Sequence, residues 1–165
     1  MAKITIGGNE IETKGTIPSV GSKAPNFKLV THELSDKTLD DYKGTRVIMN
    51  IYPSVDTGIC AISTKKFNEE ASKLANTKIL CISRDLPFAQ KRFCDAEGID
   101  NLEMLSDFKN GQFGDDYNLE MTSGPLSGLH SRVILVLDEE GTILYSEQVP
   151  EIVQEPDYNA ALNHL

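Results

Sequence analysis

Residues 46 to 60 read Arg46-Val-Ile-Met-Asn-Ile-Tyr52-Pro53-Ser-Val-Asp-Thr57-Gly-Ile-Cys60. The first seven form a near-continuous apolar run, which is typical of a strand buried on both faces of a sheet. Pro53 ends that strand, because proline has no N–H to donate to a strand ladder. The segment therefore predicts a central strand followed at once by a loop and a new element.

That new element is predicted to be a helix over residues 58–75. Three apolar residues share one face of such a helix: Phe67, Ala71 and Leu74. Asp56 and Thr57 stand where they can cap its start. Cys60 therefore falls in the first turn of the predicted helix.

The rest of the chain alternates between short apolar runs and helical spacing. Further strands are expected at residues 27–30, 78–82, 102–105, 132–137 and 142–146, and further helices at residues 85–94 and 156–165. A small hairpin is expected at residues 3–13, while residues 31–44 and 106–128 read as turn-rich and irregular. This order predicts an α/β protein of the thioredoxin-like class, with a mixed sheet, helices on both of its faces and an N-terminal hairpin.

Size and charge limit the possible functions. The 165 residues, 39% hydrophobic and 25% charged, can form one core, so residues 1–165 are expected to be a single domain. The formal net charge of −9 argues against nucleic acid as a partner, because such proteins carry a basic surface. No apolar run approaches the ~20 residues of a membrane span, and the N-terminus lacks a secretory signal, so no membrane contact and a cytoplasmic location are expected.

The three cysteines differ in their surroundings. In a reducing compartment a cysteine is more often catalytic, metal-binding or buried than part of a disulfide framework. Cys81 lies in the middle of a predicted strand and is expected to be a small buried side chain. Cys60 has turn formers and a helix cap as neighbours, which favours a reactive role. The spacings of 21 and 13 residues between Cys60, Cys81 and Cys94 match no short-loop zinc pair, so no metal is expected.

The predicted neighbours of Cys60 favour a nucleophilic thiolate. Helix N-termini and nearby cations stabilise a thiolate, and a first-turn position supplies the former. Arg132, which opens a later strand, is the best candidate cation, Thr57 can direct its hydroxyl towards the sulfur, and Pro53 can close the pocket from water. Taken singly, Thr57 would more often be only a helix cap, and Arg132 only a solvated strand flank.

The spacing Pro53-x-x-x-Thr57-x-x-Cys60 resembles the active-site signature of the peroxiredoxins, and Pro-Ser-x-Asp-Thr-x-x-Cys is the form found in the bacterial thiol peroxidases, which are atypical two-cysteine peroxiredoxins. Residues 85–94, Asp-Leu-Pro-Phe-Ala-Gln-Lys-Arg-Phe-Cys, are similar to the segment that carries that family's second reactive cysteine. Residues 132–138 resemble the strand with its active-site arginine. Gly58-Ile59 and Ser131 depart from the family's frequent Pro-Val and Ala, but neither change removes a reactive group.

This resemblance, which covers essentially the whole chain, implies a thiol-specific peroxidase that reduces hydrogen peroxide and organic hydroperoxides. In the family, the residues matching Pro53, Thr57, Cys60 and Arg132 form the peroxide site, and the residue matching Cys94 resolves the intermediate. Cys60 would become a sulfenic acid, Cys94 would condense with it to an intramolecular disulfide, and thioredoxin would restore both thiols. The resemblance also implies a homodimer and a reaction that needs no metal or organic cofactor.

The implied disulfide adds a geometric requirement. A disulfide needs Cα atoms within about 7 Å, whereas cysteines at the start of one helix and near the end of another normally lie farther apart. We therefore expect both helices to unwind partly in each cycle, next to Gly58 and Gly98.

The main alternative is a non-enzymatic redox sensor, in which the same disulfide changes the binding of a partner. A disulfide oxidoreductase is disfavoured because the chain has no Cys-x-x-Cys motif, and a tyrosine-phosphatase-like Cys-x5-Arg loop is excluded by Lys66. His130 and His164 are expected to be surface residues without a role.

Overall fold

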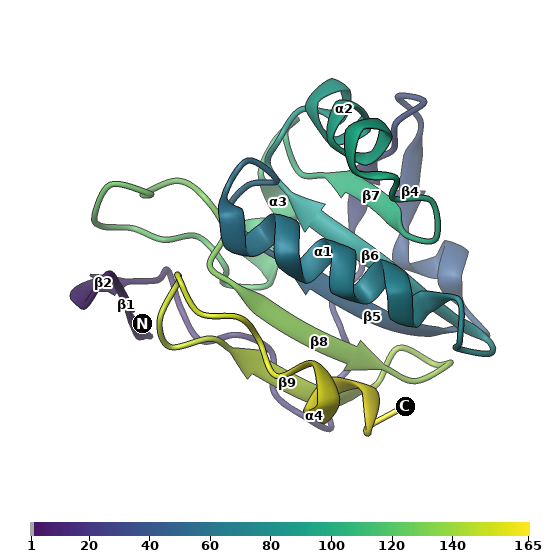
Figure 1. The fold of residues 1–165 in the computed structure, drawn as a ribbon. Helices are drawn as coiled ribbons and strands as arrows, with labels where there is room; N and C mark the ends of the chain where they lie inside the picture. The colour runs from purple at the N-terminus through teal and green to yellow at the C-terminus, as the bar shows by residue number, and fades with distance from the viewer. Residues whose placement is uncertain (1) are drawn as a thin grey trace.

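A seven-stranded mixed sheet forms the centre of the computed structural model, which describes residues 2–165 (Figure 1). The strands are β3 (Lys28–Val30), β4 (Asp36–Thr38), β5 (Arg46–Ile51), β6 (Thr77–Ser83), β7 (Glu103–Ser106), β8 (Val133–Leu137) and β9 (Ile143–Gln148), in the order β4-β3-β7-β6-β5-β8-β9. The three strands β5, β6 and β7 pair in parallel, and the other pairings are antiparallel. The predicted mixed sheet is confirmed.

Helices cover both faces of this sheet. They are α1 (Gly58–Ala71), α2 (Pro87–Glu97), α3 (Gln112–Asp116) and α4 (Tyr158–Leu162), with a short 3₁₀ helix η1 (Leu39–Tyr42). Figure 1 shows α1, α2 and α4 on the near face of the sheet. Phe67 of α1 packs in a cluster with Ile48, whereas Phe113 of α3 packs in a cluster with Met49 on the other face. Neighbouring residues of β5 thus point to opposite layers, as strand geometry requires.

The end of β5 leads directly into the helix predicted from the sequence. Helix α1 begins at Gly58 as predicted and ends at Ala71, four residues earlier than predicted. After Ala71 the chain continues in tighter turns, in which Lys73 N–H donates to Glu70 O and Leu74 N–H donates to Ala71 O. Such i→i+3 turns are a common way for a helix to end.

The predicted N-terminal hairpin is present as β1 (Lys3–Ile6) and β2 (Asn9–Glu12), which pair antiparallel as a separate two-stranded sheet. Its apolar residues Ile4 and Ile11 form a buried cluster with Met121 and Ile152. Thr5 also pairs with Glu151 in a parallel bridge. The hairpin is therefore docked onto the segment that follows β9.

Three short elements were not predicted: β4, η1 and α3 lie in segments that the sequence marks as turn-rich or irregular. Each has five residues or fewer, so none contains a full period of apolar spacing. Helix α3 starts instead from a side-chain contact, because the Asp107 carboxylate accepts hydrogen bonds from the N–H groups of Phe113 and Gly114. None of the helices within residues 2–165 has the length and apolar content that crossing a bilayer requires.

Candidate active site

Cys60 lies in the first turn of α1, just beyond the carboxyl end of β5. Its side chain is fully buried, with a relative exposure of 0%. The N–H groups of a first helical turn have no partners within the helix, and the helix dipole is positive at this end. The backbone therefore offers a favourable environment for negative charge on the sulfur.

Arg132 lies directly before β8 and reaches the sulfur of Cys60. Its Nη1 donates to Cys60 Sγ at 3.0 Å, and its Nε donates to the carbonyl of Ile152 at 2.9 Å. Arg132 is 1% exposed, and its guanidinium carries only hydrogen-bond donors. The cation that the sequence analysis placed near Cys60 is thus in direct contact with the sulfur.

Pro53 and Thr57 belong to the loop between β5 and α1. Pro53 is buried and Thr57 is half-buried, at the N-cap of the helix. Thr57 is the N-cap residue, as its position in the sequence predicted, but its side chain makes no capping hydrogen bond, because its hydroxyl donates to the carbonyl of Ser54 at 3.0 Å. This bond commits the only hydroxyl proton, so the same oxygen is left to accept a hydrogen bond from a ligand.

Asp85 anchors the loop before Cys60 through hydrogen bonds. It was not identified as a site residue from the sequence. Its carboxylate accepts from the Ser54 hydroxyl at 2.7 Å, the Val55 N–H at 2.8 Å and the Ser83 hydroxyl at 2.6 Å. The available signal was its position, because an acidic residue just after β6 must lie beside the end of the neighbouring parallel strand β5. The loop geometry before Cys60 therefore depends on a side chain from the next strand.

Cys94 lies in α2 and belongs to the same apolar cluster as Cys60 and Cys81. All three are free thiols. Burial, with a contribution from the charge of Asp95, raises the pKa of Cys94 to about 11. Burial likewise raises the pKa of Cys81 to about 12, which agrees with the predicted buried position in mid-strand. Cys94 is consequently a neutral thiol at physiological pH.

The prediction that His130 is a surface residue is wrong. The residue is fully buried, and its Nε2 lies 2.9 Å from Oδ2 of Asp107, which also lies 3.4 Å from Nε of Arg84. Burial lowers the pKa of His130 despite that carboxylate. Burial opposes ionisation of Asp107, but the hydrogen bond and charge of His130 and the Gly114 N–H outweigh it, so the pKa of Asp107 is lowered. A single sequence gave no sign of this pair, because its members are 23 residues apart.

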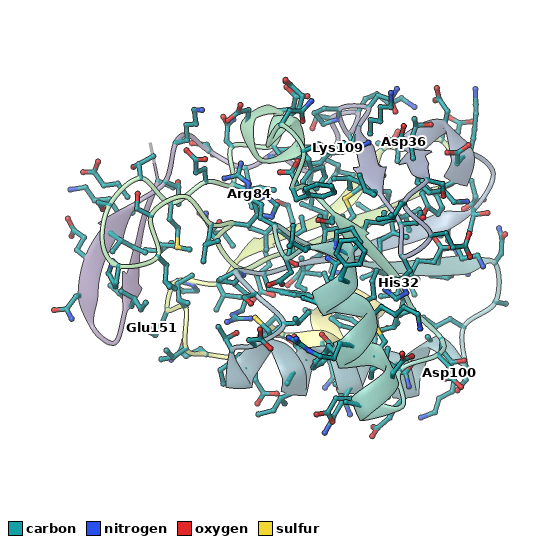
Figure 2. The ribbon with its side chains drawn as sticks, turned by 90° about the horizontal axis from the view of Figure 1, so that it is seen from above. His32, Asp36, Arg84, Asp100, Lys109 and Glu151 are labelled. Atoms are coloured by element: carbon teal, nitrogen blue, oxygen red, sulfur yellow. The ribbon has the colours of Figure 1, made fainter. Side chains whose placement is uncertain are left out.

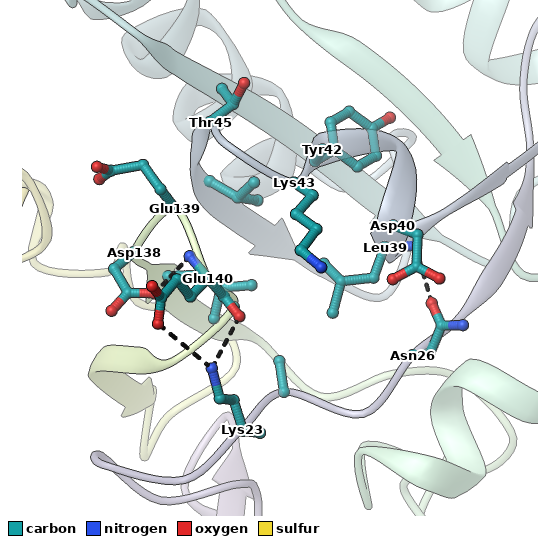
Figure 3. Close-up of a pocket in the computed structure, with 14 residues that line it drawn as sticks. Lys23, Asn26, Leu39, Asp40, Tyr42, Lys43, Thr45, Asp138, Glu139 and Glu140 are labelled. Carbon is teal, nitrogen blue, oxygen red and sulfur yellow. Dashed lines mark hydrogen bonds and ion pairs between the residues drawn. The ribbon is translucent and has the colours of Figure 1, made fainter.

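Two further features of the described residues bear on where a reaction could take place: possible metal ligands and a cavity at the other end of β5. Within residues 2–165, no group of three or more histidine, cysteine, aspartate or glutamate side chains is arranged to hold a metal ion. A cavity of about 180 Å³ is lined by Lys23, Lys43, Thr45, Val47 and Glu140, among others (Figure 3). It lies at the amino end of β5, whereas Cys60 follows the carboxyl end. The cavity is therefore separate from the Cys60 site.

The combination of a buried thiol at a helix start and an arginine on its sulfur can be compared with known proteins. The profile of the Redoxin family matches residues 19–162. The chain belongs to the Redoxin family. Thiol peroxidase of Corynebacterium glutamicum is 49% identical to this Redoxin chain over 165 residues, which is 100% of the chain and 99% of that protein.

Solved structures agree with this membership. A peroxiredoxin-like protein from Aquifex aeolicus is 34% identical and superposes with a TM-score of 0.93, over 99% of this chain and 95% of that one. A thiol peroxidase from Chromobacterium violaceum, 23% identical, superposes with a TM-score of 0.90 over 98% and 93% of the two chains, which shows a shared fold. The predicted thioredoxin-like fold class is confirmed, and this Redoxin chain is a bacterial thiol peroxidase of the peroxiredoxin group.

Proposed function

We propose that the chain reduces hydrogen peroxide and organic hydroperoxides through Cys60, resolves the product with Cys94 and takes its electrons from thioredoxin. The observation that carries this proposal is the 3.0 Å contact between Arg132 Nη1 and Cys60 Sγ. A cation held on a buried sulfur favours the thiolate, the nucleophilic form of cysteine. The 49% identical thiol peroxidase supports the same reaction class.

In the first step the Cys60 thiolate attacks the terminal oxygen of the hydroperoxide. The S–O bond forms as the O–O bond breaks, Cys60 becomes a sulfenic acid, and the other oxygen leaves as water or an alcohol after taking a proton. Arg132 remains beside the reacting atoms and stabilises negative charge as it moves from sulfur to oxygen. The Thr57 oxygen, whose own proton is donated to the Ser54 carbonyl, would accept a hydrogen bond from the O–H of the hydroperoxide.

Entry of the substrate requires a small opening of the loop. Cys60 has no exposed surface, and Pro53 and Val55 are also buried. Asp56 and Gly58 of the same loop are exposed, so the solvent boundary lies only a few residues from the sulfur. A local shift of residues 56–58 would admit a hydroperoxide while the hydrogen bonds of Ser54 and Val55 to Asp85 stay in place.

In the second step Cys94 attacks the sulfur of the Cys60 sulfenic acid. The S–S bond forms, the S–O bond breaks, and water leaves with the proton of the Cys94 thiol. Burial keeps Cys94 protonated in the reduced fold, with a pKa of about 11. Partial unwinding of α2 would expose the Cys94 thiol to solvent, which would lower its pKa, and would also bring the two sulfurs together.

Thioredoxin would then supply two electrons and two protons, and restore both thiols. We also infer that the chain acts as a single domain in the cytoplasm, since this cycle needs a reducing compartment. A homodimer is proposed as well. Three exposed apolar side chains, Ile62, Leu86 and Phe88, belong to α1 and to the start of α2, the two helices that carry Cys60 and Cys94. Such exposed apolar groups favour an interface, and size-exclusion chromatography with light scattering tests it.

A thioredoxin-coupled assay that follows NADPH consumption tests the proposed function. We expect many peroxides to be consumed per chain by the wild type, none by Cys60→Ser, none through thioredoxin by Cys94→Ser, and near-normal rates for the matched control Cys81→Ser. Full activity of Cys60→Ser would disprove the proposed chemistry. Consumption of about one peroxide per chain in the presence of reductant would instead identify a redox sensor.

A further inference from the structure

The position of Arg132 depends on a carbonyl from a distant part of the chain. Besides Cys60, the guanidinium is hydrogen-bonded to the carbonyl of Ile152, 2.9 Å from its Nε. Two donors of one rigid planar fork are thus fixed at once, and this sets the direction in which Nη1 points. Any movement of the Ile152 peptide must therefore move the cation relative to the sulfur.

The Ile152 peptide is itself held by the N-terminal hairpin. The Ile152 N–H donates to the Thr5 carbonyl at 2.9 Å, and the Thr5 N–H donates to the Pro150 carbonyl at 2.8 Å. The Ile152 side chain is 3% exposed and packs in a cluster with Ile4 and Ile11 of the hairpin. The backbone and the side chain of Ile152 are therefore both attached to the hairpin.

Glu151 fastens the turn of the hairpin to this same segment. Its carboxylate accepts from Gly8 N–H at 2.8 Å, Gly7 N–H at 3.1 Å, the Thr5 hydroxyl at 3.0 Å and Val153 N–H at 3.0 Å. Figure 2 shows Glu151 beside the two strands of the hairpin. The backbone hydrogen bonds of Val153 and Gly8 lower the pKa of Glu151, so the carboxylate is ionised at neutral pH. One side chain thus joins the turn at Gly7-Gly8 to both sides of Ile152.

We propose that Glu151 is a positioning residue for the Cys60 site: it clamps the N-terminal hairpin onto residues 150–153, and the Ile152 carbonyl held in this way aims Arg132 at the sulfur. The proposal rests on the proposed function only for its catalytic consequence. The geometric part, that the clamp determines where the cation stands, holds for any chemistry at Cys60.

The charge beside the sulfur can be read without a peroxide assay. Cys60 is alkylated in parallel by the anion iodoacetate and by neutral iodoacetamide, and the Cys60 peptide is quantified by mass spectrometry. The rate with iodoacetate divided by the rate with iodoacetamide reports a cation at the sulfur, because the same thiolate reacts in both cases and a cation attracts only the anionic reagent. We expect Glu151→Ala to lower this ratio by about fivefold, the factor that one unit-charge interaction at a few ångströms gives even in water. Circular dichroism checks that the variant is folded.

Matched variants separate positioning from stability. Glu10→Ala removes an exposed glutamate of the same hairpin, whose side chain pairs with Lys3 at the surface, and should leave the ratio unchanged. Glu151→Gln keeps one oxygen that accepts hydrogen bonds and should restore part of the ratio. If Glu151→Ala does not fold, Thr5→Val, which removes one donor to the carboxylate, is expected to lower the ratio to a smaller extent.

The two proposals fail in different ways. The positioning role would be overturned if folded Glu151→Ala had the same ratio of alkylation rates as the wild type. If the alanine variant is unfolded, the same result in Thr5→Val would overturn it. A wild type that does not turn over peroxide, combined with a lowered ratio in Glu151→Ala, would overturn the proposed function and leave the positioning role intact. If both hold, the second-order rate of peroxide consumption should fall with the ratio in the Glu151 variants.

Discussion

Nη1 of Arg132 donates to Sγ of Cys60 across 3.0 Å, although neither side chain is more than 1% exposed. A buried guanidinium is costly unless negative charge compensates it. The guanidinium donates to the Ile152 carbonyl and to the Cys60 sulfur, and of these two groups only the sulfur can become an anion. Negative charge on the Cys60 sulfur would therefore compensate the buried cation, and the cation would in turn stabilise that charge.

Replacing Arg132 by lysine should slow the reaction of Cys60 with hydrogen peroxide by about a hundredfold, as loss of a preorganised donor at a reacting centre commonly does. A single ammonium cannot donate to Ile152 and Cys60 with the fixed geometry of the planar fork. Quenched-flow mass spectrometry of the Cys60 peptide measures this rate. Arg92→Lys is the matched control, since Arg92 is 73% exposed beside Asp56. An unchanged rate in folded Arg132→Lys would contradict the assigned role.

Replacing Asp85 by asparagine should loosen the loop before Cys60. The carboxylate accepts from Ser54, Val55 and Ser83, and an amide group would turn a donor towards at least one of these donors. We expect a loss of about 1–3 kcal/mol in the free energy of unfolding by urea, with a lower peroxide rate. Asp100→Asn changes an exposed aspartate, labelled in Figure 2, and should alter neither quantity. Equal stability of Asp85→Asn and wild type would refute the anchoring role.

The sequence predicted the parts of the fold that have a clear period. The apolar run of β5, the helical face of α1 and the alternating hairpin β1–β2 are all set by residues close together in the chain. β4, η1 and α3 were missed because they are short, and the start of α3 depends on hydrogen bonds from Phe113 and Gly114 to the Asp107 side chain, which no apolar period reveals.

The site divides in the same way. Cys60 and Thr57 belong to one local motif, and the resemblance extended this to Arg132, 72 residues away. The groups that hold them are not local. Asp85 reaches Val55 across 30 residues, and its position just after β6 was its only signal in the sequence. Glu151 reaches Gly8 across 143 residues, and nothing in a single sequence pairs these two positions. His130 was wrongly placed at the surface because a histidine before a strand carries no pattern that reveals burial.

Stability should fall on mild acidification because of His130. Burial lowers its pKa in the folded state, whereas the unfolded state has the ordinary value near 6.5. Below about pH 6.5 the unfolded chain binds the proton more readily, so the free energy of unfolding decreases as the pH falls towards the folded pKa. Urea titrations between pH 7 and pH 5 measure this slope.

The variant His130→Gln should make stability depend less on pH, because the glutamine amide does not titrate. The glutamine Nε2 can still donate a hydrogen bond to Asp107, so the contact with this carboxylate is kept. His32→Gln serves as the comparison. Burial also lowers the pKa of His32, but this residue keeps more contact with solvent, so its removal should change the slope less. A slope in His130→Gln equal to that of the wild type would show that the buried pair does not control the acid sensitivity.

Disulfide formation should loosen the ends of two helices. Cys60 lies in the first turn of α1, while Cys94 lies near the end of α2, whose final turn is closed by Gly98 N–H donating to the Cys94 carbonyl with Gly98 at a φ of 68°. A disulfide requires Cα atoms within about 7 Å and a fixed torsion, which two intact helix ends of this kind do not normally permit. We expect amide hydrogen exchange to be faster in the disulfide form than in the reduced form at residues 58–64 and 88–97. The central strand β5 (Arg46–Ile51) provides the internal control and should keep its protection, because both of its edges are paired. Equal protection of the two helix segments in both forms would mean that the sulfurs meet without unwinding.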